Sequence, residues 1–132
     1  MKFILLNSPF LENAINEKEQ YLPPLGLVYI ATYLEKNGVE VEIVDCIKKR
    51  LSVDEILNYI SFCKPKYLGI NVFSQNINIV KRIIESIDIN CECFIGGQVV
   101  KCIYKDILLW NLSNPLNIII GDGEYMEPIV GD

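Results

Sequence analysis

The chain has 132 residues, of which 51% are hydrophobic and 22% charged, with a net charge of −5. This length predicts a single domain, and the apolar excess favours a sheet that is covered on both faces. The acidic balance argues against a nucleic-acid surface, and the longest apolar stretch is too short for a membrane span, so a cytoplasmic protein without a signal peptide is expected.

The first half of the chain predicts two strands joined by a helix. Residues 2–7 are a short apolar run without helical spacing, which indicates a buried strand. Residues 11–20 are polar and irregular, and so long a connection is a candidate binding loop. Pro23 and Pro24 suit the entry of a helix, which Gly38 should end in a left-handed conformation.

The same alternation continues to the end of the chain. Ser52 and Glu55 have the spacing of a capping box, so a helix should begin there and end before Pro65. Ser74 and Asn76 are candidate caps of the next helix. Apolar residues at helical spacing mark a last helix within residues 99–107. The remaining predicted strands are residues 39–45, 67–73, 91–95 and 117–120.

Strands separated by helices predict right-handed crossovers and a parallel sheet. The expected fold is a three-layer, Rossmann-like (flavodoxin-like) α/β sandwich, with a five-stranded parallel sheet in the order 2-1-3-4-5. Residues 1–132 form one domain in this interpretation. Because few residues follow Glu124, the helix over the fifth strand would be short, and the chain is expected to be truncated or to need a neighbour.

Five cysteines and no histidine limit the metal chemistry of the chain. Cys91 and Cys93 share one face of a predicted strand, but a zinc site needs about four ligands and no others are near in sequence. Reduced thiols that act as small buried hydrophobes are therefore expected. Cys46 is the partial exception, because it follows a strand on the proposed ligand edge.

Ligands of parallel α/β sheets bind outside the carboxyl ends of the strands, and several ligand classes are excluded there. The chain has neither a Walker loop nor a G-x-G-x-x-G fingerprint. It has Asn7, Ser8 and Pro9 where a phosphoacceptor receiver would have acidic residues. Without histidine it has no Ser-His-Asp or Cys-His set either.

An ordered set of short motifs carries a family resemblance across nearly the whole chain. The set is similar to the N-terminal cobalamin-binding domain of radical S-adenosylmethionine enzymes. Its segments are residues 7–10, 21–27, 31–38, 41–45, 68–74, 95–97 and 121–124, with the sequences NSPF, YLPPLGL, ATYLEKNG, VEIVD, LGINVFS, IGG and GDGE.

The resemblance implies a module that holds cobalamin over the carboxyl edge, with the nucleotide tail beside Gly96 and Gly97. It implies that Ser74 hydrogen-bonds the tail, and that Asp122 and Glu124 accept hydrogen bonds from corrin amides or the ribose. The complete set of implied cofactor-binding residues is Ser8, Pro9, Phe10, Tyr21, Asp45, Ser74, Gln75, Gly96, Gly97, Gly121, Asp122, Gly123 and Glu124.

Several of these features also have a purely structural explanation. The glycine pair and residues 121–124 could be ordinary turns, and Ser74 a helix cap. Asp45 could be a turn residue, while Phe10 and Tyr21 could cover the core or a neighbouring domain.

The chain also departs from the family pattern. The D-x-H-x-x-G motif is absent, so no imidazole is available to cobalt, and Gln98 replaces the proline usual after the two glycines. The C-x-x-x-C-x-x-C cluster motif is absent too, so an iron–sulfur cluster and S-adenosylmethionine would belong to a downstream barrel domain. Two functions are expected: a cobalamin-binding module for methyl transfer or related radical chemistry, or a cofactor-free interaction domain that packs against such a barrel.

Overall fold

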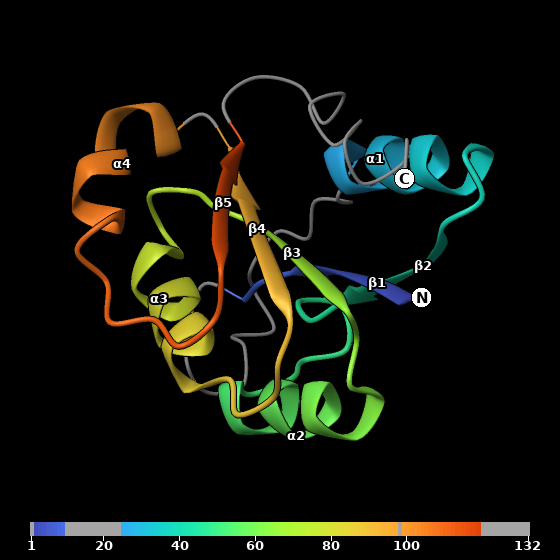
Figure 1. Ribbon diagram of the computed structural model, residues 1–132, viewed down its shortest axis with the longest axis horizontal. Helices are drawn as coiled ribbons and strands as arrows, with labels where there is room; N and C mark the ends of the chain where they lie inside the picture. Colours follow the sequence, from blue (N-terminus) through green and yellow to red (C-terminus); the bar gives the residue numbers. More distant parts are fainter. Residues whose placement is uncertain (1, 10–24, 98, 120–132) are drawn as a thin grey trace.

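The computed structural model describes residues 2–9, 25–97 and 99–119, which form one parallel α/β sheet domain (Figure 1). All four strand pairings are parallel, and the strand order is β2-β1-β3-β4-β5, so the predicted fold class is confirmed. The strands are β1 (Lys2–Asn7), β2 (Glu40–Asp45), β3 (Tyr67–Asn71), β4 (Glu92–Gly96) and β5 (Leu116–Ile119). The helices are α1 (Leu25–Lys36), α2 (Val53–Cys63), α3 (Ile77–Ser86) and α4 (Val100–Ile107).

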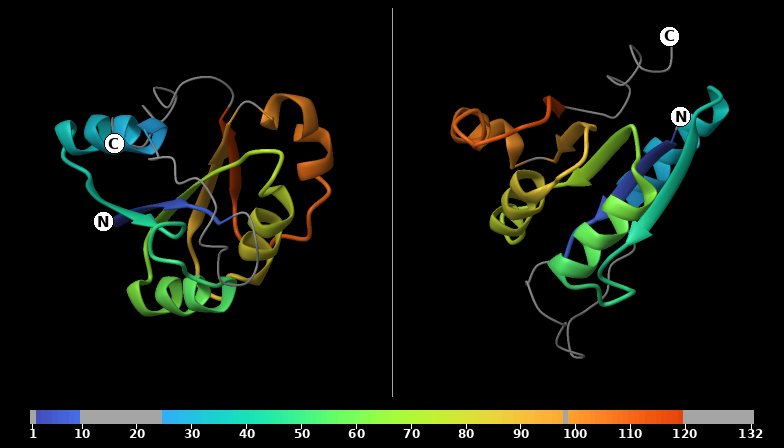
Figure 2. Two further views of the ribbon diagram at one scale, coloured as in Figure 1. Left: turned by 180° about the vertical axis from the view of Figure 1, so that it is seen from behind. Right: turned by 60° about the horizontal axis from the view of Figure 1, so that its bottom comes forward.

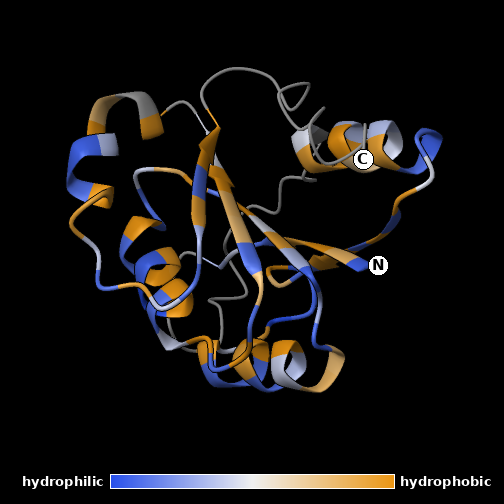
Figure 3. Ribbon diagram, in the orientation of Figure 1, coloured by the Kyte–Doolittle hydropathy of each residue, from blue (hydrophilic) through white to orange (hydrophobic). Residues whose placement is uncertain are grey.

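The sheet separates two hydrophobic cores, because successive residues of a strand point to opposite faces. On β1, Ile4 and Leu6 join the core beneath α2, α3 and α4, whereas Phe3 and Leu5 join the core beneath α1. The helices lie on both sides of the sheet in Figure 2, and hydrophobic and hydrophilic positions alternate along α3 in Figure 3, as expected for a helix with one buried face.

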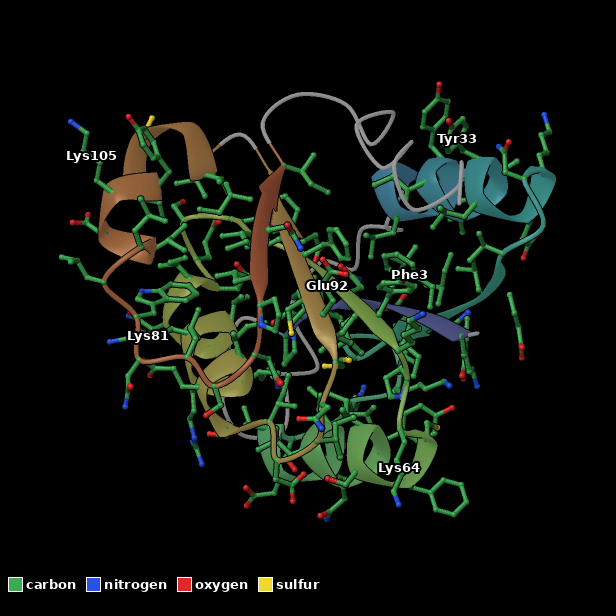
Figure 4. All side chains as sticks on the ribbon, viewed as in Figure 1. Phe3, Tyr33, Lys64, Lys81, Glu92 and Lys105 are labelled. Atoms are coloured by element: carbon green, nitrogen blue, oxygen red, sulfur yellow. The ribbon has the colours of Figure 1, made fainter. Side chains whose placement is uncertain are left out.

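Gly69 lies on β3, the middle strand of the sheet, and leaves space for larger side chains in the core beneath α1. A Cβ atom on Gly69 would lie 2.7 Å from Leu5 Cδ2 and 3.2 Å from Phe3 Cε1, so these side chains fill the space. The Phe3 ring lies 5.5 Å from the rings of Tyr67 and Phe94, and Figure 4 shows Phe3 between the sheet and α1. The aromatic cluster over Gly69 therefore holds β1, β3 and β4 together on this face.

The predicted helix ends are confirmed where the structure describes them. Ser52 and Glu55 form the capping box at the start of α2. Gly38 follows α1 with a φ of 82°, a left-handed conformation that glycine adopts without steric cost. Lys64 adopts the left-handed conformation after α2, one residue before the predicted stop at Pro65.

The predicted third strand is too long. It was expected to continue to Phe73, but β3 ends at Asn71 because the chain turns there. The Asn76 side chain closes that turn: its Nδ2 donates to the Asn71 carbonyl, and its Oδ1 accepts from the Phe73 N–H. The bounds of the other strands differ from the predicted ones by at most one residue at either end.

Strand β2 forms one edge of the described sheet and carries a partly buried carboxylate. Glu42 forms an ion pair with Lys2, at 2.7 Å, and accepts a hydrogen bond from the Tyr59 hydroxyl of α2. Partial burial alone would raise the pKa of Glu42, but these two partners outweigh it and lower the pKa below its ordinary value. An open groove of about 450 Å³ lies beside this contact, between β2 and α2.

None of the helices in the described ranges is long and apolar enough to cross a bilayer.

Candidate functional site

The carboxyl ends of the strands meet at one edge of the sheet, which we call the carboxyl edge. Asn7, Asp45, Asn71 and Gly96 are the last residues of β1, β2, β3 and β4. Asn7 is directly opposite Asp45, and Asn71 is opposite Gly96, so the four strand ends are level with one another. The loops that follow them therefore start side by side.

A chain of hydrogen bonds joins three of these strand ends. The Asn7 Nδ2 donates to Asp45 Oδ1 at 2.9 Å, and the Asn7 Oδ1 accepts from Asn71 Nδ2 at 2.7 Å. The Asn71 Oδ1 in turn accepts from the backbone N–H of Ser8 at 3.1 Å. Asn7 and Ser8 are buried, so these polar groups need protein partners, and each bond provides one.

Asp45 and Ser8 also bond to their own loops. Asp45 Oδ1 accepts a second hydrogen bond from the backbone N–H of Lys48, which makes Asp45 a turn residue as well as the end of the chain of hydrogen bonds. The Ser8 hydroxyl donates to the Pro9 carbonyl, and both residues are buried. The side chains of Ser8 and Asp45 thus make contacts within the protein at this edge.

The loop between β3 and α3 presents polar side chains outward. Ser74 and Gln75 are exposed and hydrogen-bond to each other, Ser74 Oγ to Gln75 Oε1 at 3.3 Å. Asn76 is the N-cap residue of α3, but its side chain makes no bond to the helix and instead closes the loop. The predicted capping role is therefore wrong for the Asn76 side chain, because the loop amide competes successfully for it.

The two glycines at the end of β4, Gly96 and Gly97, have different structural roles. Gly97 has a φ of 142°, and a Cβ atom there would lie 2.1 Å from the Val72 carbonyl oxygen. Only glycine fits at that close approach of two backbones. A Cβ atom on Gly96 would instead meet Ile119 at 3.5 Å, an ordinary van der Waals distance. Gly97 is therefore required by the fold, whereas Gly96 has room for a small side chain.

Three of the five thiols are buried, those of Cys46, Cys91 and Cys93, whereas Cys63 is half-buried and Cys102 is exposed, so the expectation of buried thiols is wrong for Cys102. Burial raises the pKa of Cys46 to about 12, and its thiol donates to the Val44 carbonyl, so Cys46 is not a thiolate ligand at neutral pH. Cys91 and Cys93 are both buried, with their sulfur atoms 3.7 Å apart. Within the described ranges, no three or more His, Cys, Asp or Glu side chains are grouped as a metal site.

The structure brings seven of the predicted cofactor-binding residues to the carboxyl edge. They are Ser8, Pro9, Asp45, Ser74, Gln75, Gly96 and Gly97. The other six lie outside the described residues: Phe10, Tyr21, Gly121, Asp122, Gly123 and Glu124.

Sequence reasoning did not single out the side-chain bonds of Asn7, Asn71 and Asn76. The available signal was Asn7 at the end of the first predicted strand and Asn71 two residues before the end of the third, because these two strands are neighbours in the predicted order. Where the strands end, their side-chain amides can bond across to the neighbouring strand ends.

The comparisons with known proteins give the family of the chain. A family model for the B12-binding domain matches residues 14–130 of the chain. The chain belongs to the B12-binding domain family. No curated protein and no solved structure gives a significant match.

The carboxyl edge of this B12-binding domain has groups that fit cobalamin. Ser74 and Gln75 expose a hydroxyl and a carboxamide, which suit the amides and the ribose of the cofactor, and Gly97 exposes bare backbone beside them. The family match and the fold together support a cobalamin-binding module.

Proposed function

We propose that this chain is the cobalamin-binding module of a radical S-adenosylmethionine enzyme. The observation that carries the proposal is the B12-binding domain match over residues 14–130, on a sheet whose glycine-containing carboxyl edge exposes Ser74 and Gln75. The ordered motifs that resemble the N-terminal domain of such enzymes support the choice of parent. In this proposal the enzyme is cytoplasmic, in keeping with five cysteines that are all free.

The role of the chain in this proposal is to bind and orient the cofactor. Cobalamin supplies, when bound, a cobalt centre that can carry a methyl group. Ser74 and Gln75 hold the nucleotide tail by hydrogen bonds, and the exposed backbone at Gly97 lets the tail pack closely. Because the chain has no histidine and the Cys46 thiol stays protonated, neither an imidazole nor this thiolate is offered to the metal.

The remaining chemistry lies outside the chain in this proposal. A downstream barrel domain holds the iron–sulfur cluster and S-adenosylmethionine, and methylation or a related radical reaction takes place where that barrel faces the corrin. The coding sequence after residue 132 tests this directly. A C-x-x-x-C-x-x-C triad there supports the radical enzyme, and another type of catalytic domain would refute it.

Cobalamin binding is tested by mixing the purified chain with hydroxocobalamin, removing free cofactor by gel filtration and recording the visible spectrum. A coloured complex with one cofactor per chain is expected. A colourless protein would instead favour the cofactor-free interaction domain.

The structure also selects the variant that locates the site. Substitution of Gly97 would disturb the fold itself, so exposed Ser74 is the better position. Ser74→Tyr should abolish the coloured complex while the far-UV circular dichroism stays unchanged. Ser113→Tyr is the matched control, because Ser113 is equally exposed but precedes β5 at the opposite edge of the sheet.

A further inference from the structure

The chain of hydrogen bonds at the carboxyl edge has its direction fixed at both ends. Asp45, as a carboxylate, can only accept, and the backbone N–H of Ser8 can only donate. The Asn7 amide must therefore turn its Nδ2 toward Asp45, which leaves its Oδ1 for Asn71. The same logic turns the Asn71 Nδ2 toward Asn7 and its Oδ1 toward Ser8, so no amide in the chain can flip without losing bonds.

Asn71 lies where the β1 and β3 loops meet. Its side chain bonds to Asn7 and to the first loop residue, Ser8, while its backbone carbonyl accepts from Asn76 Nδ2 at 3.1 Å. Asn76 is fully buried, and its Oδ1 accepts from the Phe73 N–H at 2.7 Å. One residue thus connects the start of the β1 loop with the closed turn that carries Ser74 and Gln75.

We propose that Asn71 is a positioning residue of the cobalamin site, which couples Ser8, the first residue after β1, to the loop that presents Ser74 and Gln75. The role of Asn71 in binding the cofactor rests on the proposed function, whereas its hydrogen bonds do not. Asn71 acts through its bonds to Ser8 and Asn76 and not by touching cobalamin.

The first test replaces the amide with an apolar side chain of similar size. Asn71→Leu leaves the Asn7 Oδ1 and the Ser8 N–H without their partner, so the Ser8 amide should exchange with deuterium about tenfold faster or more. Two-dimensional NMR of the 132-residue chain measures this exchange. The dissociation constant for hydroxocobalamin, from visible titration, should rise by about tenfold or more in the same variant.

A matched control separates positioning from a general loss of structure. Asn114 also uses its side-chain amide to fasten a loop, with Nδ2 donating to the Ile89 carbonyl at 2.8 Å, but it precedes β5 at the opposite edge. Asn114→Leu should lower the melting temperature and leave both the Ser8 exchange rate and the cobalamin affinity at wild-type values.

A second variant gives a signature that a simple packing role would not produce. In Asn71→Asp the introduced carboxylate can accept from Ser8 but cannot donate to Asn7, and a flipped Asn7 amide would turn its oxygen toward Asp45. Protonation restores a donor, so the pKa of the introduced carboxyl is raised in the folded chain. The stability of this variant therefore falls as the pH rises through the raised pKa, and its melting temperature should be further below that of wild type at pH about 8 than at pH about 5.

Each outcome decides a separate point. A colourless wild type would refute the proposed function and the cofactor part of this inference, while the exchange rates still decide whether Asn71 couples the loops. Unchanged Ser8 exchange in Asn71→Leu would overturn the coupling. Equal losses of cobalamin affinity in Asn71→Leu and Asn114→Leu would overturn the positioning role. An Asn71→Asp variant whose melting temperature differs from that of wild type by the same amount at both pH values would overturn it too.

Discussion

The carboxyl edge is built in two ways that meet at β3. At the ends of β2, β1 and β3 it consists of polar side chains bonded to one another, which we call the polar half (Asp45, Asn7 and Asn71). At the ends of β3 and β4 it consists of backbone packed on backbone, which we call the glycine half (Val72, Gly96 and Gly97). Side chains set the loop positions in the first half, whereas the lack of a side chain does so in the second.

This difference determines what each half tolerates. A substitution in the polar half removes individual hydrogen bonds. Each loss lowers the free energy of unfolding moderately, because the other hydrogen bonds of the network remain. Gly97 in the glycine half has no side chain to remove, and any substitution there adds volume where there is no room. Gly97 should therefore be the position most sensitive to substitution, whereas the polar half should respond in smaller steps.

The largest effect is expected at Gly97. Gly97→Ala places a Cβ atom 2.1 Å from the Val72 carbonyl oxygen, on a backbone with a φ of 142°. Overpacking and backbone strain together should lower the free energy of unfolding by about 3 kcal/mol or more. Urea denaturation measures the change, with Gly96→Ala as the control, since a Cβ atom there lies 3.5 Å from Ile119. Equal midpoints for the two variants would remove the distinction between the glycines.

The next effect is expected at Asn76, which supports the β3 loop. Asn76→Leu removes the acceptor of the Phe73 N–H and the donor to the Asn71 carbonyl from a buried position, and should cost about 2 kcal/mol of unfolding free energy. Asn78→Leu is the control, because Asn78 is exposed two residues further along α3. The same urea experiment applies, and a loss no larger than the control's would show that Asn76 is not a support of the loop.

A third contrast separates ligand binding from stability at the same edge. Ser74 is exposed and its hydroxyl bonds to the neighbouring, exposed Gln75, so Ser74→Ala should change the unfolding free energy by no more than about 0.5 kcal/mol. In the proposed cobalamin site, the affinity of the Ser74→Ala variant for hydroxocobalamin should fall about fivefold, because one hydrogen bond to the cofactor is lost. Wild-type affinity in this variant would show that the nucleotide tail of cobalamin does not bond to Ser74.

The smallest effect is expected in the stability of the chain in acid. The experiment tests whether Glu42 on β2 contributes to the loss of stability at low pH. Because the pKa of Glu42 is lowered in the folded chain, its stabilising contribution is complete above its ordinary pKa of 4.5 and is lost as the pH falls through the folded value. The melting temperature of wild type should thus exceed that of Glu42→Gln at neutral pH, and the gap should narrow in acid. A gap that is constant with pH would assign the acid response to other carboxylates.

The fold was predictable because its signals are local. Apolar runs between capping and turn residues locate the strands, and the capping box of Ser52 and Glu55 is present in the structure as predicted. The parallel sheet follows from strands that are separated by helices, and the order 2-1-3-4-5 is one of the common orders of doubly wound sheets, which the pairings confirm.

The site was predictable only in outline, since its interactions join residues that are far apart in sequence. The hydrogen bond from Asn71 to Asn7 spans 64 positions, and it depends on the level at which β1 and β3 end. Likewise, the need for glycine at position 97 comes from Val72, on a neighbouring strand end, rather than from the chain around it. Sequence alone indicates a glycine and an asparagine there, but not what they touch.

Strand β2 has a consequence for how copies of the molecule meet. An outermost strand leaves backbone donors and acceptors on its outer side, which invites a strand from another molecule to join. Glu40 and Glu42 both lie on β2, so two copies that approached through this strand would bring like charges together. The carboxylates thereby discourage the growth of a sheet between molecules.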